Sequence, residues 1–137
     1  MVPGRLRNFP RNIQDFLMFG TLPAYGFFCR HVTGLTLDNI DLSYKEPNYR
    51  PALFLSDAKD SRISDLNASC EERTESVIVL ENSKNLLIRS CFTSKKSGVL
   101  ATISNASHDI NFVNNRINSN ETYKSDGSIN NSEIIVK

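Results

Sequence analysis

Tryptophan is absent from this chain of 137 residues, and cysteine and glycine are scarce, with three and six residues. Many sugar-binding modules stack sugars on tryptophan rings, so this absence weakens the case for a dedicated carbohydrate-binding module. The glycines are scattered and form no phosphate-binding loop. Cys29, Cys70 and Cys91 match no zinc pattern, and their odd number leaves at least one thiol unpaired. We expect buried apolar thiols, and we predict neither a metal site nor a cofactor.

Long apolar runs and clustered basic residues are also missing. No stretch of about 18 apolar residues occurs, so no membrane-spanning segment is predicted. Sixteen Lys and Arg residues and fifteen Asp and Glu residues are interspersed, and the net charge is +1. A nucleic-acid surface needs clustered positive charge, so no nucleic-acid partner is predicted. Residues 1–9 lack the apolar core of a secretory signal, which leaves the compartment open.

What the sequence does contain is a repeat of about 25 residues. Four segments share a short apolar alternation, a polar corner, a second alternation and a longer loop. One corner position holds His31, Asp57, Asn82 and Asn105, at steps of 26, 25 and 23 residues by subtraction of their numbers. Alternation with a period of two indicates strands with one buried face, and a β repeat without helices is typical of a solenoid. The sequence therefore predicts an all-β fold, a right-handed parallel β-helix of about four coils.

The repeat also predicts how the chain is divided and which side chains are buried. Residues 1–23 are expected to form an irregular lead-in or cap, and residues 24–118 the coils. Residues 119–137 form a polar tail that ends in either a last strand or a frayed end. Equivalent residues of neighbouring coils stack at about 4.8 Å, so the corner residues should form a polar ladder that bonds its own turns and the next coil's backbone. In the third coil the inward side chains should be Ile78, Leu80, Leu86, Ile88 and Cys91, and the outward ones Glu81, Lys84, Asn85 and Arg89.

Two stretches, residues 16–40 and residues 50–57, add a family resemblance to this pattern. The first runs from Phe16 through Arg30 to Ile40, and the second begins with Arg50, Pro51 and Ala52. Both resemble the late coils of bacterial glycoside hydrolase family 28 proteins, the polygalacturonase-like members of the pectin-lyase fold. The resemblance implies a parent protein that acts on acidic plant polysaccharide and is secreted or periplasmic.

The catalytic motifs of that family are not found in this chain. The Asn-Thr-Asp, Asp-Asp, Gly-His-Gly and Arg-Ile-Lys motifs are all missing; Arg62-Ile63-Ser64 and Arg116-Ile117-Asn118 share only two letters with the last. We therefore predict no catalytic residue and expect a C-terminal portion of such a protein, inactive alone. Asp57 and Glu81 fall on neighbouring coils, where two carboxylates could act as the acid and base of an inverting glycosidase. The simpler interpretation places Asp57 in the corner ladder and Glu81 on a solvated strand.

Arg30 and Tyr25 are the predicted substrate-binding residues. Arg30 should face solvent beside Phe28, with Tyr25 nearby. A guanidinium can grip the carboxylate of an acidic sugar while aromatic rings pack on the sugar face. The alternative is an ion pair of Arg30 with a carboxylate of a neighbouring loop, and packing of Phe28 under the lead-in.

Three functions are therefore open to the chain. It is the C-terminal part of a pectin-active hydrolase, a non-catalytic polysaccharide-binding module, or a purely structural solenoid. The coil that starts near Tyr25 would expose its strand edges unless residues 1–20 cover them, and such open ends favour a fragment over a stand-alone module. We expect self-association through the exposed coil ends.

Overall fold

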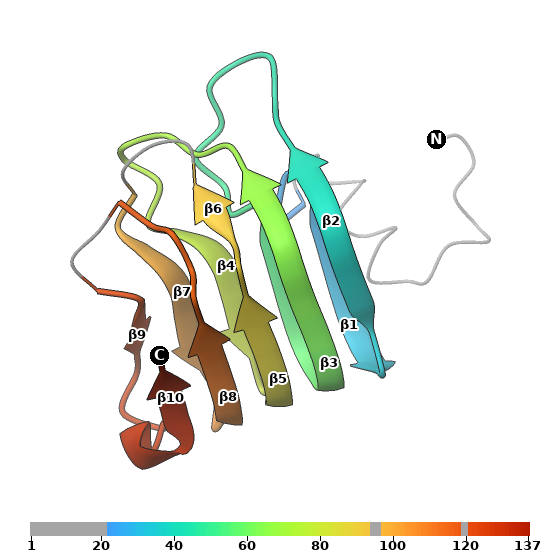
Figure 1. The fold of residues 1–137 in the computed structure, drawn as a ribbon, viewed down its shortest axis with the longest axis vertical. Coiled ribbons are helices and arrows are strands. Elements are labelled where there is room, and N and C mark those ends of the chain that lie inside the picture. Colours follow the sequence, from blue (N-terminus) through green and yellow to red (C-terminus); the bar gives the residue numbers. More distant parts are fainter. Residues whose placement is uncertain (1–21, 94–96, 119–120) are drawn as a thin grey trace.

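The repeat folds into stacked coils, each made of two strand runs joined by a sharp bend (Figure 1). The computed structural model describes residues 22–93, 97–118 and 121–137. Within them all strand pairs are parallel, so the predicted parallel β-helix of about four coils is confirmed. The strands are β1 (Phe27–Thr33), β2 (Thr36–Leu42), β3 (Leu53–Ala68), β4 (Ser76–Glu81), β5 (Lys84–Arg89), β6 (Phe92–Thr93), β7 (Val99–Ser104), β8 (His108–Val113), β9 (Tyr123–Ser125) and β10 (Ile134–Val136), and one 3-10 helix, η1, covers Asn131–Glu133.

Two walls of strands run along the solenoid. The first face consists of β1, the first half of β3, β4, β7 and β9. The second face consists of β2, the second half of β3, β5, β8 and β10. The second coil is one continuous strand, β3, that bends from one face to the other. Because β9 and β10 add to β7 and β8, the paired strands extend beyond residue 118, and Ile134–Val136 forms a last strand.

The core is a set of aliphatic columns inside the coils. Leu55, Leu80 and Ile103 stack in register on the first face, and all three are fully buried. The expected inward residues of the third coil are buried, and the expected outward ones are half-buried or exposed. Cys70 and Cys91 are buried free thiols as expected, whereas Cys29 in the first coil is half-buried. Burial raises the pKa of the Cys91 thiol to about 11, which makes it unreactive at neutral pH.

Three columns of residues with positive φ mark the bends of the coils. Asparagine and aspartate dominate them, because these short polar residues tolerate the left-handed conformation better than other residues with a Cβ. The corner position predicted from the repeat is the first of these columns, with φ between 50° and 57°. The columns are His31, Asp57, Asn82 and Asn105; then Gly34, Asp60, Asn85 and Asp109; then Asn39, Asp65, Ser90 and Asn114.

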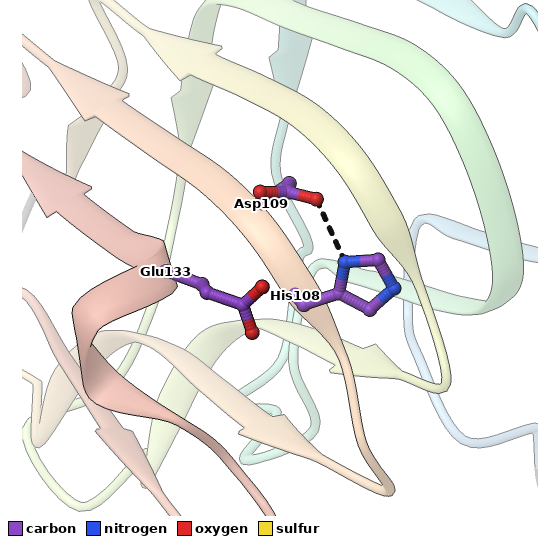
Figure 2. A group of neighbouring side chains, drawn as sticks. All are labelled: His108, Asp109 and Glu133. Carbon is purple, nitrogen blue, oxygen red and sulfur yellow. Dashed lines mark hydrogen bonds and ion pairs between the residues drawn. The ribbon is translucent and has the colours of Figure 1, made fainter.

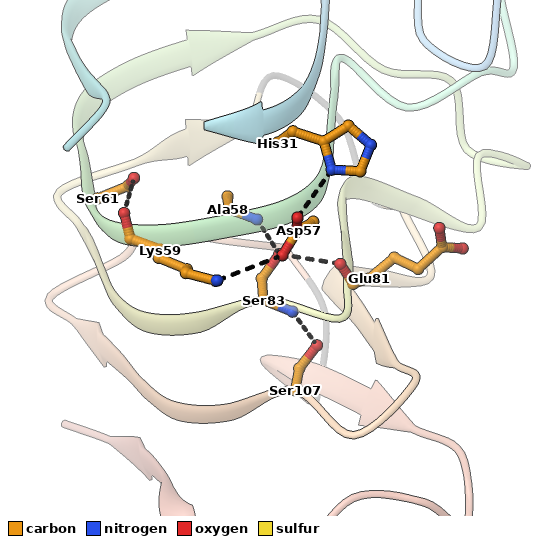
Figure 3. A network of polar contacts seen from close by, with 8 residues as sticks. All are labelled: His31, Asp57, Ala58, Lys59, Ser61, Glu81, Ser83 and Ser107. Atoms are coloured by element: carbon orange, nitrogen blue, oxygen red, sulfur yellow. Dashed lines mark hydrogen bonds and ion pairs between the residues drawn. The ribbon is translucent and has the colours of Figure 1, made fainter. Parts of the chain in front are cut away.

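Buried serines beside the first column join the coils. The backbone N–H of Ala58 donates to Ser83 Oγ at 3.1 Å, and the N–H of Ser83 donates to Ser107 Oγ at 2.9 Å (Figure 3). Each hydroxyl in turn donates to a carbonyl of its own coil, that of Glu81 or of Ser104. The bonds to the backbone of the next coil that we expected from the corner side chains are thus made by the residues after them.

The first coil is the least buried part of the stack. Phe27 occupies the same register position as Leu53, yet it is 39% exposed while Leu53 is 0% exposed. Among the described strands, β1 and β2 pair only with β3, so one edge of each faces no described strand. Residues 1–21, where the expected lead-in falls, lie outside the described residues.

Candidate functional site

The corner of the first two coils holds a charged contact. His31 Nδ1 lies 2.8 Å from Asp57 Oδ2, and Lys59 Nζ lies 4.0 Å from Asp57 Oδ1 (Figure 3). Chiefly through the hydrogen bond with His31, the pKa of the Asp57 carboxyl lies below its ordinary value. Of the predicted ladder of His31, Asp57, Asn82 and Asn105, only this first step has a side-chain contact between members in the described residues. The ladder is therefore mainly a column of equivalent backbone bends.

The carboxylates of Asp57 and Glu81 have different partners. The Asp57 carboxylate is hydrogen-bonded to His31 of the preceding coil, whereas Glu81 Oε1 accepts a hydrogen bond from Ser56 Oγ at 3.1 Å. The general acid of a glycosidase needs a raised pKa, and the pKa of Asp57 is shifted in the opposite direction. This arrangement argues against Asp57 as the acid of such a pair.

Arg30 lies on the outer side of the first face, as the alternation predicted. The register places Arg30, Ser56 and Glu81 in one outward row, and Phe28 and Phe54 in the row beside it. The Phe28 and Phe54 rings meet edge to face at 5.5 Å, and both are half-buried. Among the described residues Arg30 has no side-chain hydrogen bond or ion pair, and its side chain is exposed. A shallow hollow of about 300 Å³ lies over these two rows, lined by Pro23, Phe28, Arg30, Phe54, Ser56 and Glu81.

The hollow has a positive end and a negative end. Arg30 stands on the first coil and Glu81 on the third, two coil steps or about 10 Å apart along the solenoid. A planar guanidinium presents a fork of donors that matches a carboxylate, and the aromatic edges offer an apolar surface beside it. The size falls at the lower end of small-molecule sites. Chemically the hollow suits a ligand that carries an acid at one end and hydroxyl donors at the other.

Tyr25 does not line this hollow. Its hydroxyl donates to the carbonyl of Ser69 at 2.6 Å, and its ring meets the Tyr44 ring edge-on at 5.1 Å. Burial raises the pKa of Tyr25 to about 12. Tyr25 thus connects the first coil to the loop after β3, and its hydroxyl is already hydrogen-bonded to a backbone carbonyl. The structure brings together Arg30 and Phe28 of the expected group, together with Phe54 and Glu81, which lie one and two repeat steps further on.

His108 belongs to a second group of polar side chains, with Asp109 and Glu133. None of these three residues is among the site residues predicted from the sequence. The signal that could have found the group is the step between Asp109 and Glu133, 24 residues by subtraction, which is the step of the repeat.

Comparisons with known proteins add no assignment. No family model, curated protein or solved structure matches this chain. In residues 22–93, 97–118 and 121–137, no helix has both the length and the apolar character needed to cross a membrane.

Proposed function

We propose that this chain is a non-catalytic β-solenoid portion of a pectin-active protein of the glycoside hydrolase family 28 type, and that it holds acidic polysaccharide at the hollow around Arg30. The observation that carries the binding proposal is Arg30 itself. Its guanidinium is exposed and has no anionic partner in the described residues, and it lies beside the half-buried Phe28–Phe54 pair. The resemblance of residues 16–40 and 50–57 supports the substrate class.

The positive and negative ends of the hollow predict how an acidic sugar would be oriented in it. The carboxylate of a uronic acid unit would bind the Arg30 fork, because this is the cationic end. Its hydroxyl groups would point toward Glu81, which already accepts one hydrogen bond from Ser56 and has acceptor capacity left. A second carboxylate near Glu81 would be repelled. The hollow therefore favours one acidic unit near the first coil.

Calorimetric titration with oligogalacturonides tests this proposal. We expect binding by the native chain, a loss of at least about tenfold in affinity for Arg30→Ala, and equal or tighter binding by Glu81→Gln. Arg62→Ala is the matched control, because Arg62 is also exposed but lies on the second face. Equal affinity of Arg30→Ala and Arg62→Ala would rule out the hollow as the binding site.

A structural role is the second candidate, favoured by the exposed first coil. The apolar residues of the inner row are half-buried in the first coil, whereas the equivalent residues of the second coil are buried. The outer edges of β1 and β2 face no described strand. Unpaired parallel edges above an apolar row invite the stacking of another chain. This candidate predicts self-association, and a single monomer peak at all concentrations in size-exclusion chromatography would argue against it.

A further inference from the structure

The bend between the first and second faces brings three ligand-type side chains together at the other end of the solenoid. His108 and Asp109 begin β8, and Glu133 closes η1 directly before β10 (Figure 2). Each can place one ligand atom within 4.8 Å of the ligand atoms of the other two. Neighbouring residues of a regular strand point to opposite sides. Asp109 has a φ of 56°, and this left-handed bend allows its carboxylate to reach back to the imidazole of His108 at 2.8 Å.

The side-chain partners along the column that contains Asp109 differ between the earlier coils and this end of the solenoid. In the coils above, Asp60 Oδ1 accepts a hydrogen bond from Asn85 Nδ2 at 2.7 Å, so a donor faces an acceptor. Ile110 pairs with Ile134, and the residues directly before them are Asp109 and Glu133, which have carboxylate oxygens within 4.8 Å of each other. Two carboxylates at this distance repel each other, and a nearby cation removes that repulsion.

Cationic partners for this pair are few in the described residues. Asp109 contacts His108, and the side chain of Glu133 has no hydrogen bond or ion pair there. Lys84 is next to His108 in the register, and among the described residues it forms no ion pair with Asp109 or Glu133. Two carboxylates and one imidazole thus lie close together, and a bound cation would balance the two negative charges.

The geometry points to a divalent transition-metal site, of the Zn²⁺ class, formed by His108, Asp109 and Glu133. Imidazole together with carboxylate suits Zn²⁺ and similar ions, whereas Ca²⁺ and Mg²⁺ prefer oxygen ligands alone. Three protein ligands leave a fourth tetrahedral position for water. The ion would tie η1 and β10 to β8, and so fasten the last partial coil to the body of the solenoid. The site is independent of the proposed polysaccharide hollow, which lies on the first face.

Titration of the full chain with Zn²⁺, followed by calorimetry, tests this site. We expect one saturable Zn²⁺ per chain, weakened by at least about tenfold in Glu133→Gln and in His108→Ala; loss of an outer-shell partner alone costs that much. His31→Ala is the matched control. The His31–Asp57 pair has the same 2.8 Å contact, but no third ligand joins it in the described residues.

A thermal melt supplies a second readout. A ligand that binds only the folded chain raises the melting temperature, so Zn²⁺ should raise it for the native chain and for His31→Ala, and clearly less for Glu133→Gln at the same concentration. The inference would be overturned by the absence of saturable binding, by binding that survives in both Glu133→Gln and His108→Ala, or by an equal loss in His31→Ala. Glu133→Gln keeps the shape of the side chain, so its far-ultraviolet circular dichroism should remain native.

Discussion

At the scale of single residues, the left-handed backbone conformation explains the residue types in the corner columns better than side-chain contacts do. Asn82 is exposed, its φ is 50°, and its side chain has no hydrogen bond in the described residues. A β-branched residue with this φ is strained, and a left-handed residue costs about 1–2 kcal/mol. We therefore expect Asn82→Val to lower the free energy of unfolding by about this amount, and Asn82→Gly to lower it less. Urea denaturation measures both, and an equal loss in the two variants would contradict this explanation.

The serines beside the corners should matter more than the corner side chains. In Ser83→Ala the buried N–H of Ala58 loses its acceptor, and a buried donor without a partner costs about 1–3 kcal/mol. Ser104 points outward and its hydroxyl has no hydrogen bond in the described residues, so Ser104→Ala should change stability by less than about 0.5 kcal/mol. Chemical denaturation of the two variants separates these expectations, and comparable losses would refute the role given to Ser83.

Asp57 gives a prediction on pH. Its folded pKa lies below the ordinary value of 3.8, mainly because of the hydrogen bond with His31. A depressed pKa means that this contact stabilises the fold fully above the unfolded value, and that the contribution is lost as the pH falls through the folded pKa. In His31→Ala the pKa of Asp57 should therefore move up toward 3.8. A titration of the carboxyl carbon by NMR measures the shift, and an unchanged pKa would show that His31 is not the cause.

At the scale of elements, neighbouring coils decide how much a buried side chain contributes. Leu55 lies in β3 with a coil on each side and is 0% exposed, whereas Leu37 lies in β2 of the half-covered first coil. Leu55→Ala should cost about 2–5 kcal/mol, the range for a large-to-small change in a core, and Leu37→Ala clearly less. Thermal or urea unfolding of both variants tests this gradient. A loss at Leu37 as large as at Leu55 would mean that the first coil is covered.

The strand runs could be predicted from the sequence because their physical signal is local. Apolar alternation fixes which side chains of β4 and β5 point inward, and the repeat step fixes the register of Ile78 with Leu53. The site was harder to predict, because it depends on which residues two coils bring together. Phe54 and Glu81 line the same hollow as Arg30 only because of the register between the strands. Tyr25 precedes the first strand, where no alternation sets its direction, and its ring turned toward Tyr44.

At the scale of the whole molecule, the exposed first coil should control association. Phe27 lies in the inner row of that coil and is 39% exposed, and Phe92 is 45% exposed at β6, within the stack. A charge that points inward at an open edge blocks strand pairing, so Phe27→Lys should shift the chain toward monomer. Phe92→Lys is the matched control and should leave the association unchanged. Sedimentation at several concentrations measures both, and the same behaviour in the two variants would place the interface elsewhere.

The central claim is that the solenoid binds acidic polysaccharide at the Arg30 hollow without cleaving it. The most direct test is one experiment on the purified chain with oligogalacturonides, in which calorimetry follows binding and a reducing-sugar assay follows cleavage. Binding without release of reducing ends is the predicted result. Release that persists on further purification would contradict the claim, because it would require a catalytic pair of carboxylates. The absence of binding at millimolar ligand would equally contradict it.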